Sequence, residues 1–322
     1  MAHFDVFNGD ADGICALHQL RLAEPCPDAN LITGFKRDTR LLDQITPSAE
    51  DSISVLDISL DTNRASLERI LASGAKVLYF DHHFAGEKPF AHPSLVAHID
   101  TASDICTSLI VDRWLHGQFR LWAVTGAFGD NLHRSAHIAA DKLGLDAEIR
   151  QSLQTLGECL NYNGYGESLN DLWFHPAELY EAIRPYLIPQ DFIQEAPAFR
   201  KLYDGYKSDL KLASELHAVL DTPHAAAFEL PDAPWARRIS GILANQLAHA
   251  NPDRAHAVLT PTTHNTYTVS IRSPLNRPQG ADSLCRQFPN GGGRAAAAGI
   301  NSLAVTAVAD LLDKLNLHFR PS

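Results

Sequence analysis

Acidic and imidazole side chains gather just after apolar, strand-like segments of this chain. They are Asp10 and Asp12 in FNGDADG, Asp57 in VLDISL, Asp81, His82 and His83 in YFDHH, and Asp130 in GDN. If the preceding segments are neighbouring parallel strands, their carboxyl ends meet in one crevice, which is where open α/β sheets bind ligands. Carboxylates brought that close repel one another unless bound cations neutralise them. The pattern therefore predicts a centre for two metal ions.

Alternating strand and helix patterns would position these residues. Short β-prone runs at residues 4–7, 31–35, 53–56, 76–80 and 96–99 alternate with segments of helical periodicity at 13–23, 40–45, 62–72 and 107–115. Such alternation is typical of a parallel, doubly wound sheet. Ser103 or Asp104 would cap the helix at 107–115. Residues 121–128 fit either a helix or a strand.

The remaining sequence predicts a connector and a second domain. We expect an α/β protein with a catalytic domain at residues 1–190, a helical connector at 191–230 and a smaller α/β domain at 231–322. The segment LDTPHAAAFELPDAPW, which mixes Pro and Ala with little periodicity, marks the entry to the second domain. Residues 255–259 and 266–271 are predicted to form a strand pair there, and residues 305–317 a final helix.

Composition limits the classes of function. The chain has 322 residues, 45% hydrophobic and 20% charged, which is enough for two ordinary cores. Its net charge of -11 argues against binding long duplex nucleic acid, which needs a basic groove. The five cysteines show no CxxC spacing, and we expect a reduced, cytoplasmic location. We expect no signal peptide and no membrane association, because no apolar stretch approaches membrane-spanning length.

The motifs NGDADG, VLDISL, YFDHH, GDN and the late GGGRAAAAG, read in this order, resemble the motif set of the DHH phosphoesterase superfamily. The resemblance is to the branch with a DHH-associated C-terminal domain, which includes RecJ-like exonucleases and nanoRNase or pAp-phosphatase-like enzymes. It extends from about Phe4 to Gly299. It implies a DHH domain and a C-terminal domain with the active-site cleft between them.

The resemblance also implies a role for each matching residue. The metal ligands would be Asn8 and Asp10 for one ion, Asp12, His82 and Asp130 for the other, and Asp57 as the bridge. His83 would face the substrate phosphate, and Asp81 would orient the histidine loop. Asn8 stands where many family members have His or Asp, so we expect the first ion to be held loosely. Carboxylate and imidazole ligands favour Mn²⁺, with Mg²⁺ as the alternative.

Substrate contacts are expected near the end of the chain. Gly291, Gly292 and Gly293 can let backbone N–H groups approach an oxyanion closely. Arg272 and Ser273 match a second phosphate-contact motif of the family. Arg294 replaces the family's usual His after the glycines; it can bind phosphate bidentately but cannot donate a proton to a leaving group.

The predicted activity is hydrolysis of phosphodiester or phosphomonoester bonds in short oligonucleotides or nucleotides by a water that two metal ions activate. One alternative is an inorganic polyphosphate or pyrophosphate hydrolase, and another is a degenerate nucleotide-binding sensor. A homodimer is the default expectation for assembly. We interpret Lys36 and Arg37, after the second strand, as a solvated loop end rather than a substrate-facing pair. We interpret NYNGYGES as a packed connector loop rather than a base-stacking surface.

Overall fold

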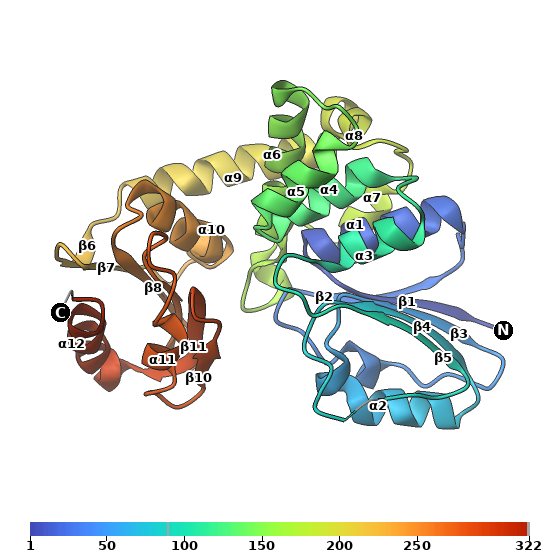
Figure 1. Cartoon of the computed structure of the whole chain (residues 1–322), viewed down its shortest axis with the longest axis horizontal. Coiled ribbons are helices and arrows are strands. Elements are labelled where there is room, and N and C mark those ends of the chain that lie inside the picture. The colour runs from blue at the N-terminus through green and yellow to red at the C-terminus, as the bar shows by residue number, and fades with distance from the viewer. Residues whose placement is uncertain (89, 321–322) are drawn as a thin grey trace. The chain divides into compact units, whose positions relative to one another are not determined.

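The chain divides into two units, Met1–Asp204 and Gly205–Ser322, with the boundary inside helix α9 (Pro197–Ser214). The computed structural model describes residues 1–88 and 90–320. The expected connector at 191–230 contains the end of α8 and all of α9, and also two strands, β6 (Ala218–Asp221) and β7 (Ala225–Glu229), that belong to the sheet of the second unit. Figure 1 shows the elements along the chain.

A parallel sheet organises the first unit. Its strands are β1 (His3–Asn8), β2 (Asn30–Gly34), β3 (Ser52–Leu56), β4 (Lys76–Asp81) and β5 (Leu95–Ile99). Within the described residues they lie in the order β2-β1-β3-β4-β5, and every pairing is parallel. This is a doubly wound order, and its switch point lies between β1 and β3. The predicted sheet is therefore confirmed, strand by strand.

Helices cover both faces of this sheet. They are α1 (Ala11–Ala23), α2 (Leu60–Ala72), α3 (Thr107–Trp114), α4 (Arg120–Gly129), α5 (His133–Asp141), α6 (Ala147–Gly164), α7 (Pro176–Ile183) and α8 (Pro189–Glu195), with short 3-10 turns η1 (Leu41–Gln44) and η2 (Leu169–Asp171). In Figure 1, α2 lies on one side of the sheet and α1, α3 and α4 on the other. Leu67 and Ile70 of α2 pack on Val55 and Tyr79 of the strands, and each such buried side chain stabilises the fold by roughly 1.5–3 kcal/mol.

Three local predictions need correction or completion. The helix expected at 40–45 is only the turn η1, because Pro47 follows closely and disfavours helix before it. Residues 121–128 belong to helix α4. Neither Ser103 nor Asp104 caps α3: the residue before the helix is Cys106, and the first amides of α3 donate to the distant carboxylate of Asp12.

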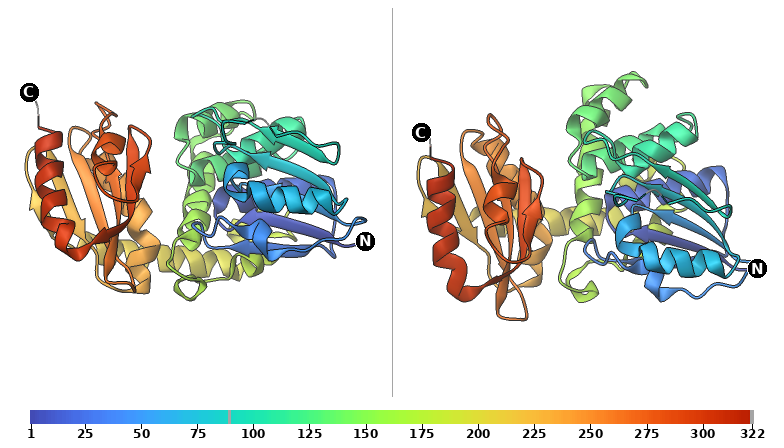
Figure 2. Two further views of the ribbon diagram at one scale, coloured as in Figure 1. Left: turned by 90° about the horizontal axis from the view of Figure 1, so that it is seen from below. Right: turned by 60° about the horizontal axis from the view of Figure 1, so that its bottom comes forward.

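A mixed sheet organises the second unit. Besides β6 and β7 it contains β8 (Ala255–Pro261), β9 (Thr266–Arg272), β10 (Gly291–Gly293) and β11 (Ala297–Ala304), and its helical elements are α10 (Pro234–Ala250), α11 (Ala281–Cys285), η3 (Val305–Ala307) and α12 (Val308–His318). Across the described residues the order is β10-β11-β9-β8-β7-β6, with only β7 and β8 parallel. Figure 2 shows α12, in red, along this sheet. Leu311 and Leu315 of α12 share a core with Ala257 and Ile271 of the strands.

Among residues 1–88 and 90–320, no helix combines the length and the apolar character needed to cross a bilayer.

Close packing of α6 against α4 fixes the end of α4. A Cβ atom at Gly157 would lie 2.3 Å from the carbonyl oxygen of Thr125 and 2.8 Å from the amide nitrogen of Gly129, both backbone atoms. Gly129 is the last residue of α4 and precedes Asp130. The glycine in α6 therefore helps to set where the Asp130 carboxylate lies.

We expect Gly157→Ala to destabilise the protein. Alanine gains about 1 kcal/mol in helix propensity, but overpacking against backbone costs roughly 1–3 kcal/mol, so the net change should be a loss of stability. Urea denaturation would measure it. Gly292→Ala is the matched control, because a Cβ atom there meets nothing within 4 Å. Equal stability of the two variants would contradict the packing argument.

Candidate metal centre

The predicted metal-binding residues lie at the carboxyl ends of neighbouring strands. Asp10 follows β1, Asp57 follows β3, and His82 follows β4, so three adjacent strands contribute to one edge of the sheet. Asp12 lies in the first turn of α1, and Asp130 is the residue that ends α4. The switch point between β1 and β3 is part of this edge, as expected for a ligand site in a doubly wound sheet.

Asp12, His82 and Asp130 form a group with the geometry of a metal site. Each offers a ligand atom, and these atoms lie within 4.8 Å of one another. The Nε2 atom of His82 lies 4.0 Å from a carboxylate oxygen of Asp130. Its Nδ1 atom lies 3.0 Å from the carbonyl oxygen of Ile105, so when Nδ1 carries the proton and donates it there, Nε2 is left free to bind a cation. The donor set therefore fits a divalent ion.

Asp57 lies beside this group. Its Oδ1 atom is 3.4 Å from Nε2 of His82 and 3.9 Å from Nδ1 of His83, and it accepts a hydrogen bond from the hydroxyl of Thr107 at 3.1 Å. Asp57, His82 and His83 form a second group whose ligand atoms lie within 4.8 Å. The backbone of Asp57 is left-handed, with φ at 61°, a conformation that Asp and Asn tolerate better than most residues.

Asp81 holds the histidine pair. It is fully buried, and its Oδ1 atom accepts from the backbone amide of His82 at 2.9 Å and lies 2.7 Å from Nδ1 of His83. The ring of His83 is itself 41% exposed. Its Nδ1 atom is therefore engaged by Asp81, while the ring keeps an exposed face.

The Asp12 carboxylate is bound by the start of a helix. Its two oxygens accept the backbone amides of Thr107 at 2.7 Å and Ser108 at 2.8 Å, the first two residues of α3. Helix N-termini carry partial positive charge and unpaired amides, so this contact stabilises the ionised carboxylate. Each oxygen accepts one such amide, which leaves lone pairs for a cation.

The residues expected around the first ion are arranged differently. One oxygen of Asp10 caps α1 by accepting the amides of Asp12 and Gly13, and the other lies 2.5 Å from Nζ of Lys36. The side-chain oxygen of Asn8 accepts the amide of Asp10 at 3.3 Å. The interpretation of Lys36 as a solvated loop end is therefore wrong: its ammonium group is paired with a carboxylate of the predicted site.

NYNGYGES also reaches this region, and its first half is not a loop. Helix α6 continues to Gly164, and Asn161 accepts a hydrogen bond from Lys36 at 3.1 Å. A Cβ atom at Gly164 would lie 3.0 Å from Cβ of Asp10. Since the contacts join α6 to the loops after β1 and β2, only the folded sheet order could reveal them.

The pKa values reflect the crowding of charges. Burial and the charges of Asp12 and Asp10 hold the pKa of Asp57 well above its usual range. Burial is also the main cause that raises the pKa of Asp130 to about 6. Burial alone would lower the pKa of His82, but the contact with Asp57 outweighs it and raises that pKa to about 10. Without a cation, protons on these groups therefore offset part of the negative charge, and binding of a cation releases them.

The predicted phosphate contacts lie in the second unit. Gly291, Gly292 and Gly293 form β10, an edge strand paired with β11, and only Gly293 of the three has a positive φ. Ser273 is buried; its hydroxyl donates to the carbonyl of Ala295 and accepts the amide of Ala281, while Arg272 donates to Asn245 and Arg294 is exposed. Their contact with a ligand stays a prediction.

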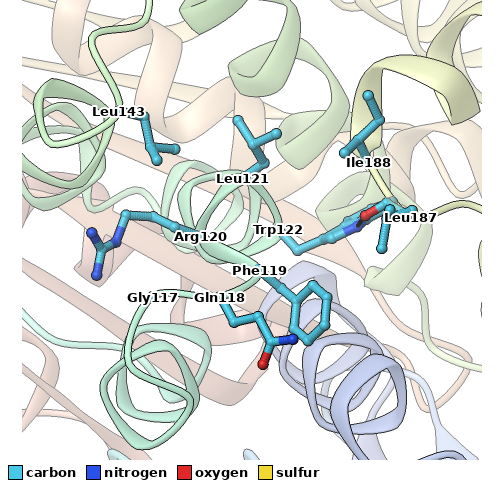
Figure 3. Close-up of a pocket in the computed structure, with 9 residues that line it drawn as sticks. All are labelled: Gly117, Gln118, Phe119, Arg120, Leu121, Trp122, Leu143, Leu187 and Ile188. Carbon is cyan, nitrogen blue, oxygen red and sulfur yellow. Dashed lines mark hydrogen bonds between the residues drawn. The ribbon is translucent and has the colours of Figure 1, made fainter.

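A separate cavity of about 430 Å³ lies at the start of α4 (Figure 3). Asp130 lies at the other end of that helix. It is lined by Gly117, Gln118, Phe119, Arg120, Leu121, Trp122, Leu143, Leu187 and Ile188. The lining is mainly apolar, and the indole nitrogen of Trp122 donates to the carbonyl of Leu187 at 3.0 Å. It contains none of the residues predicted to bind metal or phosphate.

Solved structures share this architecture. The DHH domain of a member of the s1p family of ribosomal proteins matches with a TM-score of 0.65 at 12% identity, over 99% of this chain and 87% of that one. Exonuclease RecJ bound to manganese matches with a TM-score of 0.60 at 16% identity, over 100% and 91%. PggH, a pGpG-specific phosphodiesterase from Vibrio cholerae, matches with a TM-score of 0.56 at 14% identity, over 99% and 100%.

No protein-family model and no curated protein sequence matches the chain. The fold is therefore what the comparisons establish. It is the two-domain fold of DHH-domain proteins, with a parallel sheet in one unit and a mixed sheet in the other. The resemblance seen in the motifs is confirmed at the level of fold.

We expect Asp12→Asn to weaken Mn²⁺ binding. Loss of outer-shell partners of metal sites costs roughly 10–100-fold in affinity, and removal of a charged ligand should cost at least as much. Isothermal titration of the metal-free protein would measure the affinity. Asp28→Asn is the matched control, because Asp28 is exposed and outside the cluster. A similar affinity in both variants would remove Asp12 from the site.

Proposed function

We propose that this chain is a metal-dependent phosphohydrolase that acts on short phosphorylated nucleotides or oligonucleotides. The convergence of Asp12, His82 and Asp130, with Asp57 beside them, carries the proposal. Such a site at the switch point of a doubly wound sheet suits metal-assisted hydrolysis. The shared fold of manganese-bound RecJ and of the phosphodiesterase PggH supports it.

Mn²⁺ is the proposed ion, with Mg²⁺ as the alternative, because carboxylates combined with an imidazole suit these ions better than Ca²⁺. Bound there, a divalent ion supplies positive charge that polarises the phosphoryl group and promotes the ionisation of water. Asp12, His82 and Asp130 would hold it, and Asp57 lies close enough to His82 to join them.

His83 is the proposed contact to the substrate phosphate. Burial lowers the pKa of His83, but the Asp81 carboxylate and the charge of Asp57 outweigh it and raise that pKa. The protonated ring is thereby favoured. With Nδ1 held by Asp81, Nε2 can donate to a phosphoryl oxygen, which stabilises negative charge that develops in the transition state. Asp81 would fix the direction of that donation.

The negative net charge of the protein is the reason for proposing short substrates. A net charge of -11 disfavours tracking along a nucleic acid strand, whereas a short substrate needs only local positive charge. We propose Arg272 and Arg294 as contacts to a second phosphate, with the N–H groups of the three-glycine segment beside Arg294. A cytoplasmic location and a homodimer stay predictions.

We expect Mn²⁺-dependent turnover of short nucleotides. The panel is pAp, pGpG, 5′-phosphorylated di- to pentanucleotides of RNA and DNA, and tripolyphosphate, each with Mn²⁺ and with chelator, followed by release of phosphate or mononucleotide. Activity that falls as the oligonucleotide lengthens is the expected result. Preference for tripolyphosphate would favour a polyphosphate hydrolase, and nucleotide binding without any turnover would favour a sensor.

We expect Asp57→Asn to reduce turnover at least about 10-fold, because even the loss of outer-shell partners costs roughly 10–100-fold at metal sites. Asparagine removes the charge but tolerates the left-handed backbone at φ 61°. Asp57→Ala, in contrast, would add backbone strain of about 1–3 kcal/mol. Turnover and thermal unfolding should be measured on both variants. A folded Asp57→Asn protein with near wild-type turnover would exclude Asp57 from the chemistry.

A further inference from the structure

Lys36 places a fixed positive charge inside the acidic centre. It lies two residues after β2, and its backbone amide donates to the carbonyl of Gly164 at 2.8 Å, which ties the loop to the end of α6. Its Nζ atom lies 2.5 Å from Oδ2 of Asp10 and 3.9 Å from Oδ1 of Asp130, and it donates to Asn161 at 3.1 Å. The ring of Tyr165 lies 5.5 Å away. The ammonium group is therefore held from several sides.

Asp10 has little capacity left for a metal ion. Its Oδ1 atom accepts two backbone amides, from Asp12 and Gly13, and its Oδ2 atom binds Lys36. A divalent ion on Oδ2 would lie next to the ammonium, and the two cations would repel each other. The amide of Asn8 is also engaged, since its oxygen accepts the backbone of Asp10 and its nitrogen donates to the carbonyl of Lys36.

Asp12, unlike Asp10, has no ammonium or guanidinium group among its described hydrogen-bond partners. The Asp12 oxygens accept the backbone amides of Thr107 and Ser108, one each, and the carboxylate also accepts a hydrogen bond from the uncharged thiol of Cys106. His82 can present Nε2. The four carboxylates of the centre are those of Asp10, Asp12, Asp57 and Asp130. One divalent ion together with the ammonium of Lys36 would neutralise three of these four charges, whereas two divalent ions plus the ammonium would exceed them.

We propose that Lys36 takes the place of the first metal ion, so that the centre binds one divalent ion, through Asp12, His82 and Asp130. This inference rests on the proposed function only in treating the centre as a metal site. The sequence-based expectation of two ions then becomes one ion and one ammonium group. Lys36 acts as a positioning residue, because it fixes Asp10 and supplies positive charge to the centre.

Metal stoichiometry tests the inference without reference to activity. Metal-free full-length protein would be titrated with Mn²⁺ by calorimetry, and its electron paramagnetic resonance spectrum recorded at saturation. The wild type should bind one ion per chain and give the spectrum of an isolated Mn²⁺. Lys36→Met, which removes the charge but keeps an extended side chain, should bind two ions and give an exchange-coupled spectrum.

Two further variants make the result specific. Arg37→Met, at the neighbouring cation, should still bind one ion. The double variant Lys36→Met/Asp10→Asn should return to one ion, because the additional ion of Lys36→Met needs the Asp10 carboxylate. Thermal unfolding would confirm that each variant is folded. If Lys36→Met does not fold, Lys36→Arg is the variant to measure; because it keeps the positive charge, it should bind one ion.

Each outcome decides the inference. Two ions in the wild type, or one ion in folded Lys36→Met, would overturn it, as would two ions in Lys36→Arg. One ion in the wild type without hydrolysis of any substrate would leave the inference standing and overturn the proposed function. Two ions in the wild type together with hydrolysis would overturn the inference and leave the proposed function standing. The absence of Mn²⁺ binding would overturn both the inference and the proposed function.

Discussion

Repulsion among buried carboxylates is the constraint on which the first unit depends. Asp10, Asp12 and Asp57 are each at most 2% exposed, and burying charge without compensation is costly. The compensation comes from elements far apart in the sequence. The loop after β2 provides the ammonium of Lys36, α3 provides two amides for Asp12, and β4 leads to His82 beside Asp57. The centre therefore exists only when the sheet and helices are assembled.

The same constraint explains a local departure from regular geometry. Asp57 adopts a left-handed backbone, and its amide donates to the carbonyl of Phe80 at the end of β4. This turn directs the carboxylate toward His82 rather than along the strand. Strained backbone at such a position persists only where its surroundings fix it. Here the neighbouring strand and the hydroxyl of Thr107 do so.

The sequence could predict the strands, their parallel arrangement and the gathering of Asp10, Asp57 and His82 at one edge of the sheet, because each motif follows a strand and the carboxyl ends of parallel strands share an edge. It could not predict contacts that depend on which strands are neighbours. Lys36 meets Asp10 because β2 lies next to β1, and Asp12 caps a helix that begins 95 residues later. The rule that places Asp10 and Asp57 at the edge of the sheet applies equally to Lys36, because Lys36 also follows a strand, β2.

A lysine and a metal ion are different sources of positive charge. The occupancy of a metal site depends on the concentration of the ion and on pH, whereas an ammonium group is present in every folded molecule. Burial lowers the pKa of Lys36, but the charge of Asp10 outweighs it and raises that pKa well above its usual range, so the group stays charged. An ammonium group, however, has no coordination sites for the oxygen atoms of water or phosphate. Polarisation of a substrate and of water would therefore fall on the ion held by Asp12, His82 and Asp130, while Lys36 would keep the Asp10 carboxylate in place.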